Sequence, residues 1–263
     1  MADPERAAAD RFRGDHPGLA LPPVVVVVPA YGEAATVGTV VSSVPRTMAG
    51  LATAVLVVDD GSADDTAARA LAAGAVVCRL PVNRGQGAAL RVGYALAVEH
   101  GARFLATLDA DGQWAGSDLP RLVELVAGGR ADLVSGTRRR AQRRDPERWS
   151  ARGAGVVVFA WLIRVLTGSR VTDPANGLRV MTAEVASGVE LTQPQFQAAE
   201  LLVSALCRGF RYAEVPVGHE RRPVGSSRKG GSLSYGWRFS RALLGTWRRE
   251  RRRTRSLERH RSP

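Results

Sequence analysis

Five consecutive valines, Val24–Val28, lie between Pro23 and Pro29 near the start of the chain. β-Branched residues favour strands, and an unbroken apolar run is typical of a strand covered on both faces. Short apolar runs and helical patterns then alternate along the first half of the sequence. Strands are expected over 54–58, 76–80, 104–108 and 132–135, and helices over 63–73, 87–100 and 118–126. This alternation predicts an α/β fold whose mostly parallel, Rossmann-like sheet is sandwiched by helices.

The second half of the chain is less regular. Helices are expected over 153–166 and 197–207 and a strand over 212–217, whereas 171–179 is expected to be a polar turn. An amphipathic helix that mixes aromatic residues with arginines is expected over 234–249. Because no linker or repeat divides the chain, a single folded domain is expected over residues 21–232. A disordered segment over residues 1–20 should precede it, and a basic amphipathic helix or tail over residues 233–263 should follow it.

The net charge of +12 is high for a chain with ordinary apolar (45%) and charged (24%) contents. Residues 248–261 hold eight arginines and two glutamates, so they contribute 8 − 2 = +6. Such a run suits an anionic membrane surface or a nucleic acid, and a solvated tail explains it equally well. No apolar run reaches the ~18 residues that span a bilayer, so any membrane association should be peripheral. The two cysteines lack metal-ligand spacing and no secretory signal precedes them, so a cytosolic location is expected.

Polar residues follow three of the expected strands, at 29–33, 59–62 and 109–113. In a doubly wound sheet, ligands bind beyond the carboxyl ends of the strands, so these segments should converge. Asp109 and Asp111 are one residue apart and should project to the same side. Two neighbouring carboxylates are unfavourable without a cation between them, and the usual solution is a divalent metal that carries a phosphorylated substrate.

Two other nucleotide-binding classes do not fit this pattern. A dinucleotide-binding site requires G-x-G-x-x-G after the first strand, where this chain has Ala30-Tyr-Gly-Glu-Ala34. The only similar element, Gly85-Gln-Gly87, follows the third expected strand. No G-x-x-x-x-G-K-[ST] motif is present, which excludes a P-loop NTPase.

A set of short motifs, taken together, resembles family 2 glycosyltransferases of the GT-A fold, close to the dolichyl- or polyprenyl-phosphate sugar synthases. They run in family order from about residue 24 to 230, and two positions depart from the family pattern: Gly32 replaces the usual Asn, and Arg228 a common Lys. The matching stretches are Val28-Pro-Ala-Tyr-Gly-Glu33, Val57-Val-Asp-Asp-Gly-Ser62, Asn83-Arg-Gly-Gln-Gly-Ala88, Asp109-Ala-Asp-Gly-Gln113, Gly136-Thr-Arg138, Thr172-Asp173, Gly177-Leu-Arg179, Glu214-Val-Pro-Val217 and Arg222-Pro-Val-Gly-Ser-Ser-Arg228.

The resemblance implies roles for individual residues. Asp109, Asp111 and Gln113 would bind Mg²⁺ or Mn²⁺, which neutralises charge on the leaving nucleoside diphosphate. Arginines would clamp phosphate, since a guanidinium fork matches phosphate oxygens. The nucleotide-sugar site would comprise Pro29, Tyr31, Glu33, Val58, Asp60, Asp109, Ala110, Asp111, Gln113, Arg138, Arg222 and Arg228.

Several assignments have alternatives. Arg139 or Arg140 could replace Arg138, and Arg221 could replace Arg222, while Arg152 is either a further phosphate ligand or a solvated helix terminus. Asp173 would lie beside the acceptor, either as the general base for an alcohol or as a residue that orders the turn. A phosphate acceptor is already ionised and needs no strong base.

The expected activity is therefore metal-dependent, inverting transfer of a sugar from a nucleotide sugar to a polyprenyl phosphate, catalysed by Asp109, Asp111 and Asp173. The enzyme is expected at the cytoplasmic face of the cell membrane, with its basic C-terminal segment on anionic lipid. A hydroxyl acceptor, on a glycan or a small molecule, is the alternative within the class. Outside it, the rival is a non-enzymatic basic protein that binds membranes or nucleic acid. A nucleic-acid partner is not expected, because three acidic strand ends would repel phosphate unless they bind metal.

Overall fold

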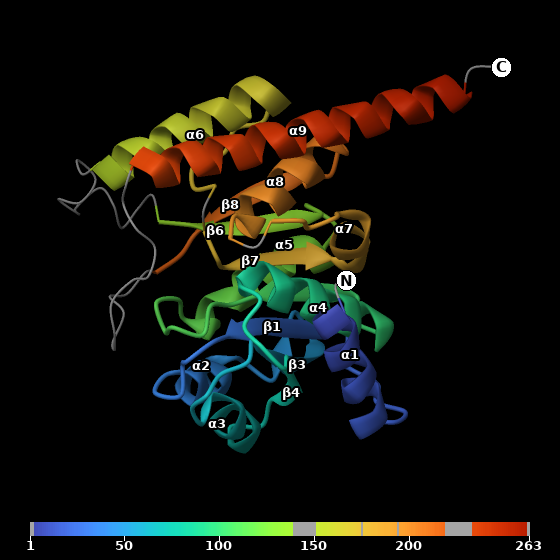
Figure 1. Ribbon diagram of the computed structural model, residues 1–263, viewed down its shortest axis with the longest axis vertical. Helices are drawn as coiled ribbons and strands as arrows, with labels where there is room; N and C mark the ends of the chain where they lie inside the picture. The colour runs from blue at the N-terminus through green and yellow to red at the C-terminus, as the bar shows by residue number, and fades with distance from the viewer. Residues whose placement is uncertain (1–2, 139–150, 175, 194, 219–232, 262–263) are drawn as a thin grey trace.

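The computed structural model describes residues 3–138, 151–174, 176–193, 195–218 and 233–261 (Figure 1). Its strands form one eight-stranded sheet with β4 paired to β3. Four neighbouring strands from the first half of the chain pair in parallel, as expected for this part of the sheet. The full order across the sheet is β2 (Thr47–Met48), β3 (Leu51–Asp59), β1 (Val24–Ala30), β5 (Phe104–Thr107), β7 (Arg179–Thr182), β6 (Leu133–Thr137) and β8 (Tyr212–Pro216). Strand β4 (Val76–Arg79) lies off this path and pairs with β3.

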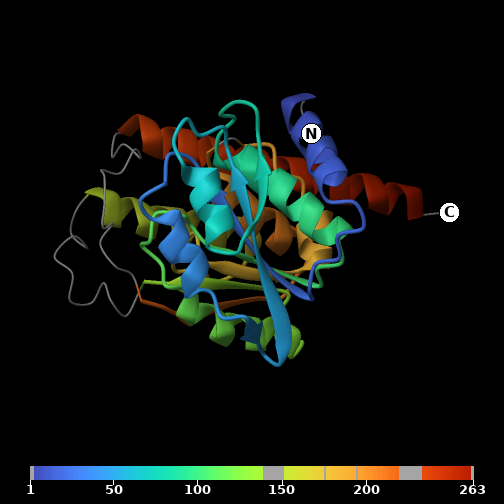
Figure 2. The same ribbon diagram turned by 90° about the horizontal axis from the view of Figure 1, so that it is seen from below.

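The valine run forms the fully buried central strand β1, as its composition predicts. Val25 and Val27 belong to a core cluster shared with α4 (Gln86–Glu99), and Val24, Val26 and Val28 to a second cluster shared with α2 (Val37–Ser43), α3 (Thr66–Ala72) and α5 (Leu119–Ala127). Figure 2 shows α4 and α5 on opposite sides of the strands. Burying each of these valines contributes about 1.5–3 kcal/mol, so the strand is held from both faces.

Strand β7 differs from the polar turn expected before Val180. It runs antiparallel to β5 and β6, and so joins the two halves of the sheet. Only four residues long, it is buried at Arg179, Val180 and Met181. A strand this short has too little sequence pattern to be recognised, because its two neighbours supply the pairing. The sheet is therefore mixed, and parallel pairing resumes between β6 and β8.

The N-terminal segment is helical, which corrects the expectation of disorder over residues 1–20. Helix α1 spans Asp3–Asp15 and buries Ala8, Ala9 and Phe12 against the core that includes α4. Glu5, only 1% exposed, forms an ion pair with Arg91 of α4 at 2.6 Å. The small apolar face of this helix was too weak a pattern to predict alone, and its packing against α4 stabilises it.

Helices α6 (Ala151–Thr167) and α9 (Leu233–Arg261) form an outer layer over α8 (Gln197–Cys207) at the end of the molecule opposite α2 and α3 (Figure 1). The short elements η1 (Gly116–Asp118) and α7 (Ala183–Gly188) complete the described structure. Phe239 and Leu243 of α9 are buried, so the apolar side of this helix faces the protein. Among the described residues, no helix is long and apolar enough to cross a membrane.

Candidate active site

Three polar segments meet at one edge of the sheet because β1, β3 and β5 are parallel neighbours. Ala30 at the end of β1 is in register with Asp59 at the end of β3, and Val27 is in register with Thr107 at the end of β5. Asp109 follows Thr107 by two residues. The three polar strand ends predicted to converge therefore lie together.

Pro29 and Val58 form the wall of this edge, and Tyr31 stands at its rim. Pro29 and Val58 are paired in the sheet and buried, whereas Tyr31 is 40% exposed. The Glu33 backbone N–H donates to Thr66 Oγ1 at 2.9 Å, which attaches the loop after β1 to α3. Of these residues, Tyr31 exposes an aromatic side chain, whereas Pro29 and Val58 support the strand ends from within.

Asp60 organises the loop that precedes α4. Its carboxylate, 3% exposed, accepts hydrogen bonds from the backbone N–H groups of Arg84 (2.8 Å) and Gly85 (2.7 Å). Burial raises the pKa of Asp60 above its ordinary value, and these two N–H groups offset part of that rise. Gly85 has φ +88°, a left-handed conformation that glycine adopts without strain. Asp60 thus fixes the backbone of residues 84–85 beside the end of β3.

The turn after β5 presents Asp109, Asp111 and Gln113, all half-buried, with Ala110 packed beneath them. Asp109 Oδ1 accepts from Gln86 Nε2 at 2.7 Å, and Asp111 Oδ1 accepts from the Gln113 backbone N–H at 3.1 Å. The interaction with Gln86 was not foreseen, although Gln86 lies in the Asn83–Ala88 motif. The first turn of α4 therefore fixes the first aspartate of the pair.

The donor set of this turn fits a hard divalent cation. Carboxylate oxygens from Asp109 and Asp111, with the amide oxygen of Gln113, are the ligand type that Mg²⁺ and Mn²⁺ prefer. Within the described part of the chain, no group of three or more His, Cys, Asp or Glu side chains is arranged to hold a metal. A cation here would therefore complete its shell with oxygens of the substrate and water, as Mg²⁺ commonly does.

Asp173 and Arg138, predicted for different roles, contact each other. Arg138 Nε and Nη2 donate to the two Asp173 oxygens at 2.7 and 2.9 Å, and Asp173 is 3% exposed. The guanidinium also lies over the Trp114 ring, 5.9 Å from its centroid. Burial acts to lower the pKa of Arg138, but the bonds and charge of Asp173 outweigh it, and the net pKa lies above its ordinary value. Bidentate geometry fixes both side chains.

Glu214 of β8 holds the turn that carries Asp173, a role that the sequence did not indicate. Its carboxylate accepts from the backbone N–H groups of Thr172 (2.7 Å) and Asp173 (3.3 Å), and from the hydroxyls of Thr172 and Tyr212. The signal available in the sequence was an acid within a strand pattern, which carries a strong penalty unless it is hydrogen-bonded. Glu214 therefore connects β8 with the 172–173 turn.

Two further features join the 173–177 segment to the rest of the site. Arg179, 2% exposed, donates to the carbonyl oxygens of Asn176 (2.9 Å) and Pro174 (3.1 Å) and to that of Ala198 in α8. At Gly177, an added Cβ would lie only 2.1 Å from Asp109 Oδ2. The segment that carries Asp173 thus lies directly against the turn that carries Asp109.

Some predicted residues cannot be placed. Arg222 and Arg228, with the alternatives Arg139, Arg140 and Arg221, lie outside the described residues. Arg152 belongs to α6, but its side chain is likewise outside the described part.

Comparisons with known proteins agree with this geometry. Residues 25–182 match the model of the family described as glycosyl transferase family 2. A dolichyl-phosphate hexose transferase of Haloferax volcanii is 32% identical over 206 residues, covering 76% of this chain and 83% of the relative. An undecaprenyl-phosphate mannosyltransferase of Micrococcus luteus is 30% identical over 224 residues, covering 80% and 88%.

A solved structure shares the architecture. The crystal structure of glucosyl-3-phosphoglycerate synthase from Mycobacterium tuberculosis, in complex with Mn²⁺, uridine diphosphate and glucosyl-3-phosphoglycerate, aligns with a TM-score of 0.64 and 23% identity. The alignment covers 90% of this chain and 83% of that one. The predicted GT-A fold is thereby confirmed. The chain belongs to glycosyl transferase family 2, and it is a glycosyltransferase.

Proposed function

We propose that this glycosyltransferase moves a sugar from a nucleotide sugar to a polyprenyl phosphate, with inversion at the anomeric carbon. One observation carries the proposal: the turn with Asp109 lies against the segment with Asp173 at Gly177. A donor diphosphate held at the first and an acceptor held at the second would be neighbours. The relatives named for dolichyl-phosphate and undecaprenyl-phosphate transfer support this choice of acceptor.

On the donor side, Tyr31 would contact the base, with the buried Pro29 and Val58 supporting this part of the site, and the loop anchored by Asp60 would lie beside the ribose. Glu33, Ala110 and the 109–113 turn would complete the nucleotide site. Asp109, Asp111 and Gln113 would hold Mg²⁺ or Mn²⁺, which supplies positive charge for the leaving nucleoside diphosphate. The neighbouring structure solved with Mn²⁺ and uridine diphosphate supports a cation of this kind.

On the acceptor side, the paired state of Asp173 favours a phosphate over an alcohol. Both Asp173 oxygens accept from Arg138, so the carboxylate is engaged rather than poised to remove a proton. A phosphate monoester is already ionised near neutral pH and attacks without a strong base. Arg138, Arg222 and Arg228 would clamp the phosphates of the nucleotide sugar. In a single displacement, the acceptor oxygen bonds to the anomeric carbon as the bond to the diphosphate breaks.

The acceptor class also indicates a location. A polyprenyl chain resides in a bilayer, so the enzyme should act at the cytoplasmic face of the cell membrane as a peripheral protein. The +6 charge of residues 248–261 is suited to anionic lipid there.

A panel of labelled nucleotide sugars incubated with undecaprenyl phosphate and Mg²⁺ or Mn²⁺ tests the proposal. We expect one donor to give label in the organic phase, and chelation by EDTA to remove it. Asp111→Asn should abolish this label and leave the melting temperature nearly unchanged, because Asp111 is half-buried at the surface of the turn. Label that appears only on a water-soluble hydroxyl acceptor would overturn the proposal of a polyprenyl phosphate acceptor. That result would favour Asp173 as a general base. Absence of donor binding with either cation would refute the metal-dependent reaction.

A further inference from the structure

Helix α6 leaves an apolar face uncovered by the described residues. Val157, Val158, Trp161 and Val165 are 68%, 56%, 62% and 60% exposed. At 100° per residue, these positions fall within one arc of the helix, and the fully buried Ile163 lies on the other side. Four of the eight large apolar residues that the described structure exposes are on this one helix. Solvent-facing apolar residues concentrated in this way mark a contact surface.

Helix α9 adds positive charge to the same outer layer. Trp237 is 64% exposed, and Arg241, Arg248 and Arg252 follow it on the exposed side of the helix. Helix α6 contains no Asp or Glu, and Glu250 of α9 is buried. Among the side chains described for these two helices, therefore, no acid offsets the exposed arginines.

The two helices are fixed to each other. The Phe159 and Phe239 rings lie 4.1 Å apart between centroids, and Trp247 Nε1 donates to the Leu166 carbonyl oxygen at 2.8 Å. The outer layer is therefore a single packed unit with an apolar part on α6 and a basic part on α9.

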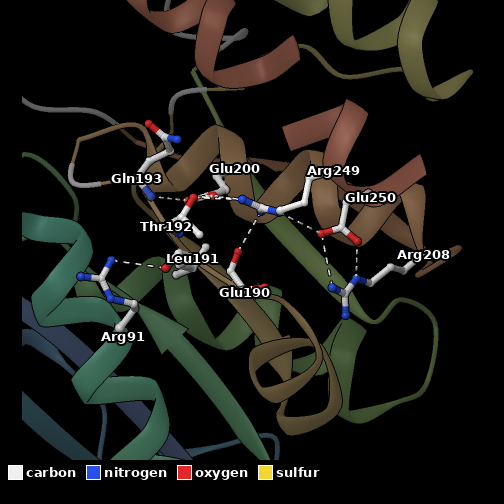
Figure 3. A network of polar contacts seen from close by, with 9 residues as sticks. All are labelled: Arg91, Glu190, Leu191, Thr192, Gln193, Glu200, Arg208, Arg249 and Glu250. Carbon is white, nitrogen blue, oxygen red and sulfur yellow. Dashed lines mark hydrogen bonds and ion pairs between the residues drawn. The ribbon is translucent and has the colours of Figure 1, made fainter. Parts of the chain in front are cut away.

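Two buried carboxylates attach this unit to the domain (Figure 3). Glu200 of α8 accepts from Arg249 of α9 at 3.0 Å, and Glu250 of α9 accepts from Arg208, which follows α8, at 2.8 Å. Arg249 also donates to the Glu190 carbonyl oxygen at 3.0 Å, so α9 is joined to the loop before α8. These contacts fix α9 to α8 and to the loop before it.

We propose that this outer α6–α9 face docks on an anionic lipid surface, with the α6 valines and Trp161 in the headgroup region and the α9 arginines on lipid phosphates. The proposal rests on the proposed function, which requires a lipid acceptor, and it names the residues that would meet the bilayer. It also changes the role expected of the C-terminal segment. Phe239 and Leu243 pack inside the protein, so α9 contributes charge and α6 contributes apolar insertion.

A lipid surface fits this face better than another macromolecule does. Exposed valines, tryptophan and arginines match the surface of a bilayer, where anionic headgroups lie next to apolar acyl chains. A nucleic acid would require several aromatic residues for stacking among the cations, whereas the described side chains of the two helices expose only Trp161 and Trp237, and the α6 face is mainly aliphatic. Both helices also begin on the side of the molecule where β6, the strand that precedes Arg138, and β8 end (Figure 1).

Co-sedimentation of the full chain with vesicles tests the proposal. Vesicles of phosphatidylglycerol and phosphatidylcholine are compared with phosphatidylcholine alone. We expect Val157→Ser/Trp161→Ser to lower binding to the anionic vesicles about tenfold or more, because it removes inserted apolar area. Arg241→Gln/Arg248→Gln/Arg252→Gln should weaken binding to anionic vesicles and reduce its salt dependence. The control Leu71→Ser/Val82→Ser removes two exposed apolar residues elsewhere (64% and 51% exposed) and should bind like the wild type.

Activity measured on two acceptors separates this proposal from the proposed function. Val157→Ser/Trp161→Ser should retain transfer to a short, water-soluble prenyl phosphate and lose transfer to undecaprenyl phosphate in vesicles. Wild-type protein that transfers to neither acceptor refutes the proposed function, while its vesicle binding still tests the face. Unchanged vesicle binding by the α6 variant overturns the docking proposal. The docking proposal is also overturned if sedimentation velocity shows that the wild type is a dimer and the α6 variant a monomer, while both bind vesicles equally. The apolar face of α6 would then be a contact between two copies of the chain.

Discussion

At the scale of single residues, Gly177 shows how closely the two sides of the site are packed. An added Cβ would lie 2.1 Å from Asp109 Oδ2 and 2.7 Å from its Cγ. Gly177→Ala must therefore displace the carboxylate or the 173–177 segment. We expect transfer to fall about a hundredfold, because a shift of about 1 Å at a reacting centre has this effect. Steady-state kinetics under saturating donor would measure it.

A second glycine provides the control. Gly245 lies in α9 with no heavy atom within 4 Å of its ideal Cβ. Gly245→Ala should leave transfer unchanged and stabilise the protein by about 0.5–1 kcal/mol, the usual gain for alanine within a helix. Equal activities for the two variants would show that Asp109 has room to move without consequence.

Glu214 is expected to act as a positioning residue. It accepts four hydrogen bonds that hold the 172–173 turn and the Tyr212 hydroxyl. Glu214→Gln places an NH₂ group where an acceptor is needed, so we expect a loss of about 1–3 kcal/mol of stability. Because the turn carries Asp173, the KM for the acceptor should rise more than the KM for the donor. Glu124→Gln, at an exposed position of α5, is the matched control. Equal increases in both KM values would point to a purely structural role.

At the scale of elements, helix α9 is part of the folded domain as far as Glu250. Ending the chain after residue 247 removes Arg249 and Glu250, and leaves the buried Glu200 and the partly buried Arg208 without these partners. We expect this truncation to lower the free energy of unfolding by about 3 kcal/mol or more. Ending the chain after residue 253 keeps both ion pairs and should change stability little. Urea unfolding of both truncations measures the difference, and equal stabilities would show that the two pairs contribute nothing.

The elements that the sequence predicted are those whose pattern is local. The valine run of β1 and the alternating units up to β6 have enough apolar residues to be recognised alone. In contrast, β7 and α1 depend on partners: β7 on the strands at either side, and α1 on a surface of α4 that no local pattern reveals. The residues of the site differ in the same way: some have a local sequence signal and others do not. Asp109 and Asp111 were predicted from their place after a strand, whereas the Gln86, Glu214 and Arg138–Asp173 contacts depend on tertiary packing.

At the scale of the whole molecule, the first and last helices close around the domain proposed for residues 21–232. Helix α1 covers one side of the core and α9 another, and each is attached by a buried glutamate, Glu5 or Glu250. Neither terminal element behaves as a loose appendage. Global stability should therefore report on groups that lie beneath them.

Cys78 is such a group, covered by α1. Its side chain is 1% exposed and its Sγ lies 3.9 Å from the Ala8 carbonyl oxygen. Burial raises the pKa of the Cys78 thiol from 9.0 to about 12. Between these values the unfolded chain releases this proton and the folded chain keeps it. The Cys78 thiol therefore leaves the free energy of unfolding unchanged below pH 9. As the pH rises from 9 toward 12, its titration lowers that free energy by about 1.4 kcal/mol per pH unit.

Urea unfolding at about pH 8 and about pH 10.5, which lie below and within this window, checks the expectation. Wild-type protein should lose about 2 kcal/mol more than Cys78→Ala between the two conditions, since alanine has no proton to release. Other groups that titrate in this range, including Tyr94 and Cys207, are common to both proteins and cancel in the comparison. Equal losses in the two proteins would show that the folded thiol ionises as readily as the unfolded one. That result would mean that α1 leaves Cys78 open to water, and the N-terminal helix would then not seal this side of the core.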